Sequence, residues 1–203
     1  MAGWSTHRGR AVSLPQANID TDQLIPARFM SVPRAQGYGP YLLHDLRRDE
    51  AGDLKADFPL NAHDATSVLV AGRNFGSGSS REAAVYALID AGIRAVVAPS
   101  FGDIFAANAV NNGLLPAQID EASCEMLADK LGGRSQDIVI DIGAWSLLLG
   151  SIGAQFALDD SWALKLINGW DDIDLTRNHG VAIAAFKNIR HQTTAWAWPS
   201  GAD

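Results

Sequence analysis

The sequence predicts an α/β fold, because short apolar runs typical of buried strands alternate with segments of helical periodicity. The clearest unit begins with SVLVAG at Ser67, a run that favours a buried strand, and continues through a glycine-rich loop. EAAVYALIDAG, from Glu82, then has one apolar helical face, and RAVVAPS, from Arg94, favours the next strand. Residues 67–98 are therefore expected to form a β-loop-α-β unit.

The rest of the chain continues this alternation. GDIFAANAVNNG, from Gly102, favours a helix that stops at its asparagine pair and glycine, and LLPAQI resumes extended structure. Glu121–Leu131 is expected to be a helix with one apolar stripe, which makes Cys124 most simply a small core residue. DIVIDI and SLLLGSIGAQFAL favour paired strands, and HGVAIAAFKNI favours a closing helix. The residues expected on the inward face of that helix are Ala182, Ala185, Phe186 and Ile189.

Composition predicts one domain and excludes some classes of binding partner. With 203 residues, 47% of them hydrophobic, the chain is long enough for one well-buried core, so residues 1–203 are expected to form a single domain. The 23 acidic and 16 basic residues give a net charge of −7, which argues against nucleic acid or an anionic membrane as a partner. No run is long and apolar enough to cross a membrane. A single cysteine and a start, MAGWSTHRGR, without the apolar core of a secretory signal favour a reducing, cytoplasmic setting.

Residues 31–66, called the excursion below, interrupt the pattern with prolines, glycines and charges and show little periodicity. Loops of this length inside a compact domain are usually functional or mobile, so the excursion is a candidate for shaping a substrate site or contacting a partner. A solvated insertion without a role is the alternative.

The glycine-rich loop, GRNFGSGSSREAA at residues 72–84, is the first candidate for chemistry. It lacks the Gly-Lys-Ser/Thr ending of a Walker loop and the third glycine of a dinucleotide fingerprint. What remains are backbone N–H groups at a helix start, two hydroxyls and a guanidinium, which suit a carboxylate as well as a phosphate. An anion site and a purely structural turn both fit these residues.

Four motifs in order connect this loop to a known family. They are NFGSGSSRE at 74–82, NIDTDQLIPARF at 18–29, APSFGDIFAANAVNNGLLP at 98–116 and NGWDDIDLT at 168–176. Together they closely resemble the small subunits of 3-isopropylmalate dehydratase, the swivel-domain members of the aconitase superfamily. The resemblance covers nearly the whole chain and implies a swivelling β/β/α domain of the aconitase C-terminal type.

The resemblance also implies a function. Family members work as heteromers in which a large subunit carries a [4Fe-4S] cluster and the small subunit closes over it. Together they interconvert 2-isopropylmalate and 3-isopropylmalate by dehydration and rehydration, in leucine biosynthesis. Because cluster ligation takes several cysteine thiolates and this chain has only Cys124, we expect it to hold no metal and to depend on the large subunit for the cluster.

The same resemblance assigns roles within the loop. By position in the motif, Ser79 is the expected base for a carbon-bound proton, and Arg81 is the expected bidentate clamp for a substrate carboxylate. A serine oxygen needs N–H donors and positive potential for this role, which nearby glycines and a helix start provide. The remaining loop residues expected to contact the substrate or the loop itself are Asn74, Gly76, Gly78 and Ser80.

A second group of candidates lies outside the loop. The resemblance places Asp20, Thr21 and Asp22 near the substrate, although from the residues alone they could equally bind a cation, orient a catalytic group or cap a helix. Arg28 is a further candidate carboxylate contact, with a plain surface arginine as the alternative. Discrimination among substrate side groups is expected from residues 31–61 of the excursion. The residues expected to form this specificity loop are Tyr38, Tyr41, Leu42 and Leu43.

Departures from the family pattern bear on the substrate. Relatives commonly have cysteine at the position of Ser77, histidine at that of Ala83, and a basic segment where this chain has DDSWALKLI at 159–167. A paralogue acting on citramalate or another substituted malate is therefore the alternative enzyme. A non-catalytic binding subunit of the same fold is the alternative outside the enzyme class, although the intact Ser-Ser-Arg core argues against it.

Overall fold

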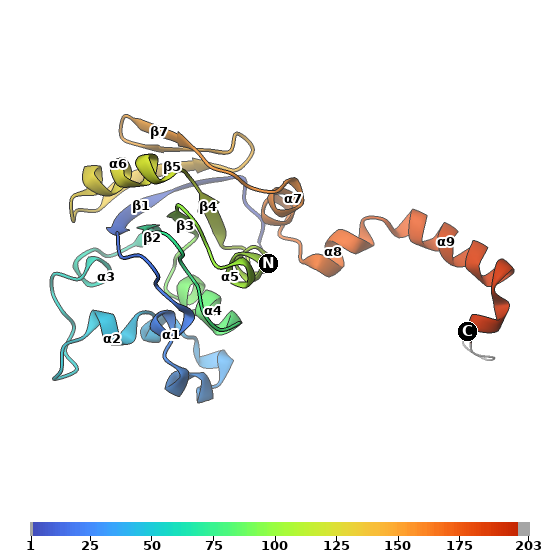
Figure 1. Cartoon of the computed structure of the whole chain (residues 1–203), viewed down its shortest axis with the longest axis horizontal. Coiled ribbons are helices and arrows are strands. Elements are labelled where there is room, and N and C mark those ends of the chain that lie inside the picture. The colour runs from blue at the N-terminus through green and yellow to red at the C-terminus, as the bar shows by residue number, and fades with distance from the viewer. Residues whose placement is uncertain (1, 199–203) are drawn as a thin grey trace.

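The computed structural model describes residues 2–198, and at its centre lies one mixed seven-stranded sheet (Figure 1). The strand order is β4-β3-β2-β1-β5-β6-β7. Strands β1 to β4 run parallel, whereas β5, β6 and β7 form an antiparallel meander joined to β1. The strands are β1 (Thr6–Leu14), β2 (Thr66–Ala71), β3 (Ala95–Ala98), β4 (Leu115–Gln118), β5 (Gln136–Asp141), β6 (Ser146–Leu149) and β7 (Ile152–Gln155).

Helices connect the strands and follow them. The α-helices are α1 (Thr21–Leu24), α2 (His44–Arg47), α3 (Pro59–Ala62), α4 (Glu82–Asp90), α5 (Asp103–Asn111), α6 (Glu121–Leu131), α7 (Asp160–Asn168), α8 (Asp172–Arg177) and α9 (Gly180–Thr193). Short 3-10 turns are η1 (Ala27–Ser31), η2 (Arg34–Gln36), η3 (Gly39–Tyr41) and η4 (Ala195–Ala197). None of the helices within residues 2–198 has the length and apolar character needed to cross a membrane. The α/β prediction is confirmed, and β2-α4-β3 is the predicted β-loop-α-β unit.

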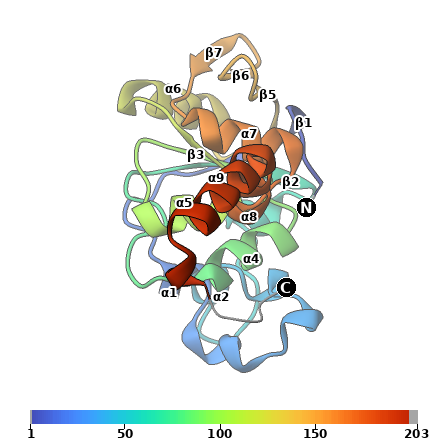
Figure 2. The ribbon, with the colours of Figure 1, turned by 90° about the vertical axis from the view of Figure 1, so that its right-hand side faces the viewer.

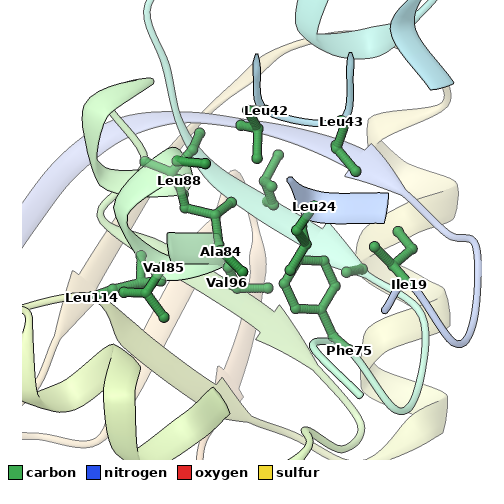
Figure 3. Close-up of a cluster of buried hydrophobic side chains, with 14 of the residues drawn as sticks. Ile19, Leu24, Leu42, Leu43, Phe75, Ala84, Val85, Leu88, Val96 and Leu114 are labelled. Atoms are coloured by element: carbon green, nitrogen blue, oxygen red, sulfur yellow. The ribbon is translucent and has the colours of Figure 1, made fainter. Parts of the chain in front are cut away.

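Two hydrophobic cores lie on opposite faces of the sheet. Because side chains alternate along a strand, Val68 and Val70 of β2 enter a core with α6 and the antiparallel strands. Leu69 and Ala71 enter the other core, which α1, α4 and the excursion cover (Figure 3). The central strands are apolar on both faces for this reason, as their continuous hydrophobic runs predicted.

Helix α6 has the predicted bounds because its local signals agree. The Asp120 carboxylate accepts a hydrogen bond from the N–H of Ser123 (2.8 Å), which caps the first turn. Gly132 ends the helix in the left-handed conformation, at φ +52°. The stripe between these caps is buried and includes Cys124, as predicted.

The excursion is a series of short turns that belongs partly to the core. Leu42 and Leu43 are fully buried, and Tyr38 is nearly so. Arg34 makes a bidentate ion pair with Asp90 at the end of α4 (2.7 and 3.0 Å). The alternative of a solvated insertion is therefore wrong for this part of the excursion, which is fastened to α4.

The C-terminal arm, defined here as residues 171–198 with α8, α9 and η4, projects away from the sheet (Figure 1). In Figure 2, which looks toward that side, α9 stands in front of the rest of the chain. The predicted helix is present, but its predicted inward face is wrong, because Phe186 is 65% and Ile189 60% exposed and no residue of α9 is buried. The apolar stripe was recognised correctly, but the other residues of 2–198 do not cover it.

Candidate functional site

Three loops that follow parallel strands meet at one edge of the sheet, because parallel strands end at the same edge. The glycine-rich loop after β2 lies between the loops after β1 and β3. The N–H of Gly76 donates to the carbonyl of Ile19 (2.7 Å), and the N–H of Phe75 donates to the carbonyl of Ser100 (3.0 Å). The N–H of Gly102 donates in turn to the carbonyl of Phe75 (2.9 Å). The backbone of the glycine-rich loop is thus held from both sides.

The glycines of the loop determine its backbone shape. Gly76 has φ +72°, and a Cβ at this position would lie 2.2 Å from the ring of Phe105. Gly78 has φ +93°, a conformation that side chains rarely adopt. Both predicted positions therefore need glycine for the path of the chain.

Asn74 makes hydrogen bonds that hold the glycine-rich loop, and it does not line the cavity described below. Its backbone is left-handed at φ +59°, and its N–H donates to the hydroxyl of Ser100 (2.8 Å). Its side-chain amide donates to the Oδ1 of Asn18 (2.8 Å), which is also left-handed at φ +58°. Sequence analysis did not identify Asn18 as a partner, although it opens the second motif.

Asp20 caps helix α1. Its carboxylate accepts from the N–H of Gln23 (2.7 Å), and the Gln23 side chain accepts from the N–H of Asp20 (3.1 Å), which together form a capping box. The capping alternative left open by the sequence is thus the one the structure shows for Asp20.

Thr21 fastens the first loop to the glycine-rich loop. Its side chain is buried, its hydroxyl donates to the carbonyl of Ser79 (2.9 Å), and its N–H donates to the carbonyl of Ser77 (2.9 Å). Thr21 therefore sets the position of Ser79 through the backbone.

Arg81 forms an ion pair with Asp22 across the two loops. The arginine side chain is only 20% exposed, whereas that of Asp22 is 54% exposed and faces solvent. A guanidinium has five N–H donors, so this pairing leaves donors available for a substrate carboxylate. The sequence placed both residues near the substrate, but their separation of 59 positions gave no indication that they pair.

Ser79 borders a small open cavity of about 180 Å³. The walls come from residues 76–79, Thr21, Arg81 and the first turn of α5, residues 102–105. Helix α4 begins just after Arg81, so two helix N-termini direct positive potential toward the cavity, although Asp103 adds one carboxylate. Ligand pockets usually measure about 300–1000 Å³, so the cavity has the size of a partial site. Ser80 is exposed but does not line it.

The first turn of α5 is the part of the site that sequence analysis missed. Gly102 and Asp103 lie within the third motif, and a glycine directly before a helix was the available signal. A Cβ at Gly102 would lie 2.6 Å from the carbonyl oxygen of Gly76, so the close approach of the two loops requires a glycine here.

Arg28 does not line this cavity but pairs with Asp45 in the excursion. The hydrogen bond from Arg28 is the main cause that lowers the pKa of Asp45 to about 2. The guanidinium also lies 4.6 Å from the ring centroid of Phe29, which stacks on Tyr41 at 4.4 Å. Arg28 is thus part of an exposed cluster of rings and charges.

The prediction for the specificity loop needs correction at three of its four residues. Leu42 and Leu43 are fully buried in the core beneath α4 (Figure 3), and the N–H of Leu43 donates to the carbonyl of Leu24 (3.0 Å). Tyr38 is buried with its hydroxyl bonded to the carbonyl of Val32 (3.1 Å). These side chains pack inward because the excursion supplies part of the core. Of the four, Tyr41 alone is half-buried, and its ring stacks on Phe29 without lining the cavity.

The residues of this chain do not fit an iron–sulfur cluster. Cys124 is the one cysteine, its thiol donates to the carbonyl of Ala71 (3.2 Å), and burial raises its pKa to about 11. Ligation requires thiolates, which this environment disfavours. Within residues 2–198, no group of three or more His, Cys, Asp or Glu side chains is arranged to hold a metal.

Comparison with known proteins gives consistent matches. A family model described as the aconitase C-terminal domain matches residues 1–122. The 3-isopropylmalate dehydratase small subunit of Shouchella clausii is 40% identical, over 90% of this chain and 93% of that protein. The small subunit of Shewanella oneidensis is 42% identical, over 97% and 99%. A crystal structure of 3-isopropylmalate dehydratase from Methanocaldococcus jannaschii matches with a TM-score of 0.65 and 25% identity, over 89% of this chain and 98% of that one.

Proposed function

Because the chain belongs to the family of 3-isopropylmalate dehydratase small subunits, with a fold of the aconitase C-terminal type, we propose that it is the small subunit of a hydro-lyase that interconverts 2-isopropylmalate and 3-isopropylmalate in leucine biosynthesis. The observation that carries this proposal is the juxtaposition of Ser79 and Arg81 at an open cavity between two helix N-termini. A hydroxyl and a guanidinium in this arrangement suit a substrate that has a carboxylate beside an acidic C–H bond.

In this proposal Ser79 exchanges the proton on the carbon that is dehydrated. Its side chain is exposed at the cavity, and its carbonyl is fixed by the Thr21 hydroxyl at 2.9 Å. A serine oxygen becomes basic only where positive potential stabilises its deprotonated form, and the start of α4 directly after Arg81 supplies such potential. Ser79 takes the proton during dehydration and returns it during rehydration.

Arg81 would hold one substrate carboxylate, with Asp22 keeping its guanidinium in place. The ion pair sets the orientation of the planar fork before the substrate arrives. A substrate carboxylate then binds to the donors that Asp22 does not use. This placement aligns the neighbouring C–H bond with Ser79, and such orientation of the reacting groups raises the rate of proton transfer.

The large subunit would carry the [4Fe-4S] cluster, because one buried thiol cannot ligate it in this chain. When bound there, that cluster would supply a Lewis acid for the leaving hydroxyl. The small size and openness of the cavity support a site that only the partner completes.

We also infer that residues 1–203 work as one swivel domain bearing the C-terminal arm, and that the enzyme acts in the cytoplasm, where a thiol such as Cys124 stays reduced.

The test is to mix the purified chain anaerobically with the cluster-loaded large subunit of the same enzyme. Conversion of 2-isopropylmalate to 3-isopropylmalate is expected, together with its loss in Ser79→Ala. Ser151→Ala, an exposed change in the turn between β6 and β7, is the matched control and should remain active. Conversion of citramalate alone would favour a paralogous enzyme, and a complex inert towards every isomer would favour a binding subunit.

A further inference from the structure

The C-terminal arm presents an apolar stripe that no other segment in the described part of the chain covers. At helical spacing, one side of α9 consists of Ala182, Ile183, Phe186 and Ile189. All four residues are exposed, and Trp196 in η4 is 85% exposed. By contrast, Trp198 folds back toward Lys187, whose Nζ lies 5.9 Å from its ring centroid. The stripe therefore stays open although the arm has contacts of its own.

A helix of this kind needs a binding surface. Isolated helices shorter than about 12–15 residues are marginal in water, and most helical stability in proteins comes from packing an apolar face. Helix α9 has 14 residues and buries none of them. Ala182, Phe186 and Ile189 follow the i, i+4, i+7 spacing with which helices dock into apolar grooves, and Ile183 lies beside them on the helix surface.

The part of the arm that contains α9 differs in charge from the root of the arm, where Asp171, Asp172 and Asp174 lie. Residues 177–198 include three basic residues, Arg177, Lys187 and Arg190, and no acidic one, whereas the chain has a net charge of −7. Arg190 follows Phe186 by four positions and so lies along the edge of the stripe. Residues 177–198, unlike the root of the arm, thus suit an apolar groove with an acidic rim.

The root of the arm is connected to the active-site loop. The nearly buried Lys165 side chain, 6% exposed, pairs with Asp172 at the start of α8 and donates to Asn111 at the end of α5 (3.0 Å). Asn111 also donates to Asp172 (3.0 Å). The next residue, Asn112, donates to the carboxylate of Glu82 (2.7 Å), which directly follows Arg81. The arm is therefore anchored beside the face that a large subunit has to close.

We propose that α9 docks, through its apolar stripe, into an acid-rimmed groove of the dehydratase large subunit. This inference rests on the proposed function, because it assigns the surface that recruits the partner implied there. A second copy of this chain is the competing occupant, since its acidic body would also attract the arm. The position of the root favours the large subunit, because the partner that completes the cavity meets the arm on the same side.

The experiment compares Phe186→Glu with Val181→Glu in binding to the large subunit by calorimetry. Val181 is 89% exposed and lies outside the stripe, about 140° around the helix from Phe186, so it is a matched apolar-to-acidic control. Phe186→Glu should weaken the complex at least about 30-fold, as loss of a central interface residue does, and Val181→Glu should change it less than about threefold. At saturating concentrations of large subunit, turnover by Phe186→Glu should recover, because the cavity is untouched.

A chain truncated after Arg177 provides the second test. It should keep the melting temperature of the full chain, because α9 buries nothing, and should lose affinity for the large subunit at least as strongly as Phe186→Glu. Unchanged affinity in both variants overturns the proposal, as does a lower melting temperature of the isolated truncated chain. Disruption of a homodimer with unchanged heteromer affinity would assign the stripe to a second copy instead. Failure of the unaltered chain to bind the large subunit would refute the proposed function itself, so the two failures are distinguishable.

Discussion

Replacing Gly76 by alanine should destabilise the isolated chain by about 2–4 kcal/mol. The new Cβ would lie 2.2 Å from Cγ and 2.6 Å from both Cδ atoms of Phe105, whose buried ring packs against those of Phe75 and Phe101 at centroid distances of 5.5 and 6.4 Å. Overpacking of this kind costs about 1–3 kcal/mol, and φ +72° adds about 1–2 kcal/mol of backbone strain for alanine. The reduced entropy of the unfolded chain offsets about 0.4–1 kcal/mol. For a chain of this length the melting temperature should fall by about 5–15 °C.

Urea and thermal unfolding followed by circular dichroism provide the measurement, and Gly78→Ala provides the control. Gly78 has φ +93°, but a Cβ there would make only an ordinary contact, 3.5 Å from the Cβ of Asp20. Its replacement therefore adds backbone strain without the ring clash.

A double-mutant cycle with Phe105→Leu separates the two contributions. The smaller side chain should relieve the clash, so the two changes should be non-additive by about 1 kcal/mol or more. A coupling below about 0.5 kcal/mol would refute the steric argument and leave backbone strain as the whole effect.

Four further predictions concern the site and the core. Ser79→Ala should reduce kcat of the assembled enzyme by orders of magnitude with KM little changed; near-normal turnover would mean that another group is the base. Arg81→Lys keeps the charge but loses the planar fork, so steady-state kinetics should show a higher KM and a lower kcat, and an unchanged KM would contradict the clamp. Thr21→Val removes the hydroxyl that donates to the carbonyl of Ser79, so it should lower the free energy of unfolding by about 1 kcal/mol and reduce kcat. Thr21→Ser keeps the hydroxyl and should retain kcat. Equal losses of kcat in both variants would exclude the hydrogen bond as the cause. Burial raises the pKa of Cys124 from 9.0 to about 11, so the free energy of unfolding should fall as pH rises through that interval. Urea titrations at several pH values measure this fall, which should be smaller in Cys124→Ala.

Much of the fold was predictable because its signals are local. The bounds of α6 follow from a carboxylate cap, an apolar stripe and a terminal glycine that lie within one short segment. The central strands were recognisable because both faces are buried, which leaves an uninterrupted apolar run such as that of β2. The excursion gave no such signal, because 3-10 turns and four-residue helices have no sustained periodicity. Its contribution to the core, through Leu42 and Leu43, was therefore not predictable.

The candidate site was also predictable only in part. The glycine-rich loop and its Ser-Ser-Arg run were evident from residue types and from the family resemblance. The capping role of Asp20 was one of the alternatives left open by the sequence, and Gln23, three residues later, completes the capping box. The pairing of Asp22 with Arg81 and the wall formed by the first turn of α5 depend on parallel strands that end at one edge.

The sequence by itself determined the class of the fold, the order of most elements and the candidate residues for the proposed chemistry, because these depend on short-range periodicity and residue type. Only the tertiary structure decided which loops meet, which side chains of the excursion are buried and whether α9 packs on its own chain. An apolar stripe indicates that a helix face favours burial, but the covering surface is set by contacts between distant segments or by another molecule. For α9 the described residues of this chain supply no such surface, so its apolar face remains exposed.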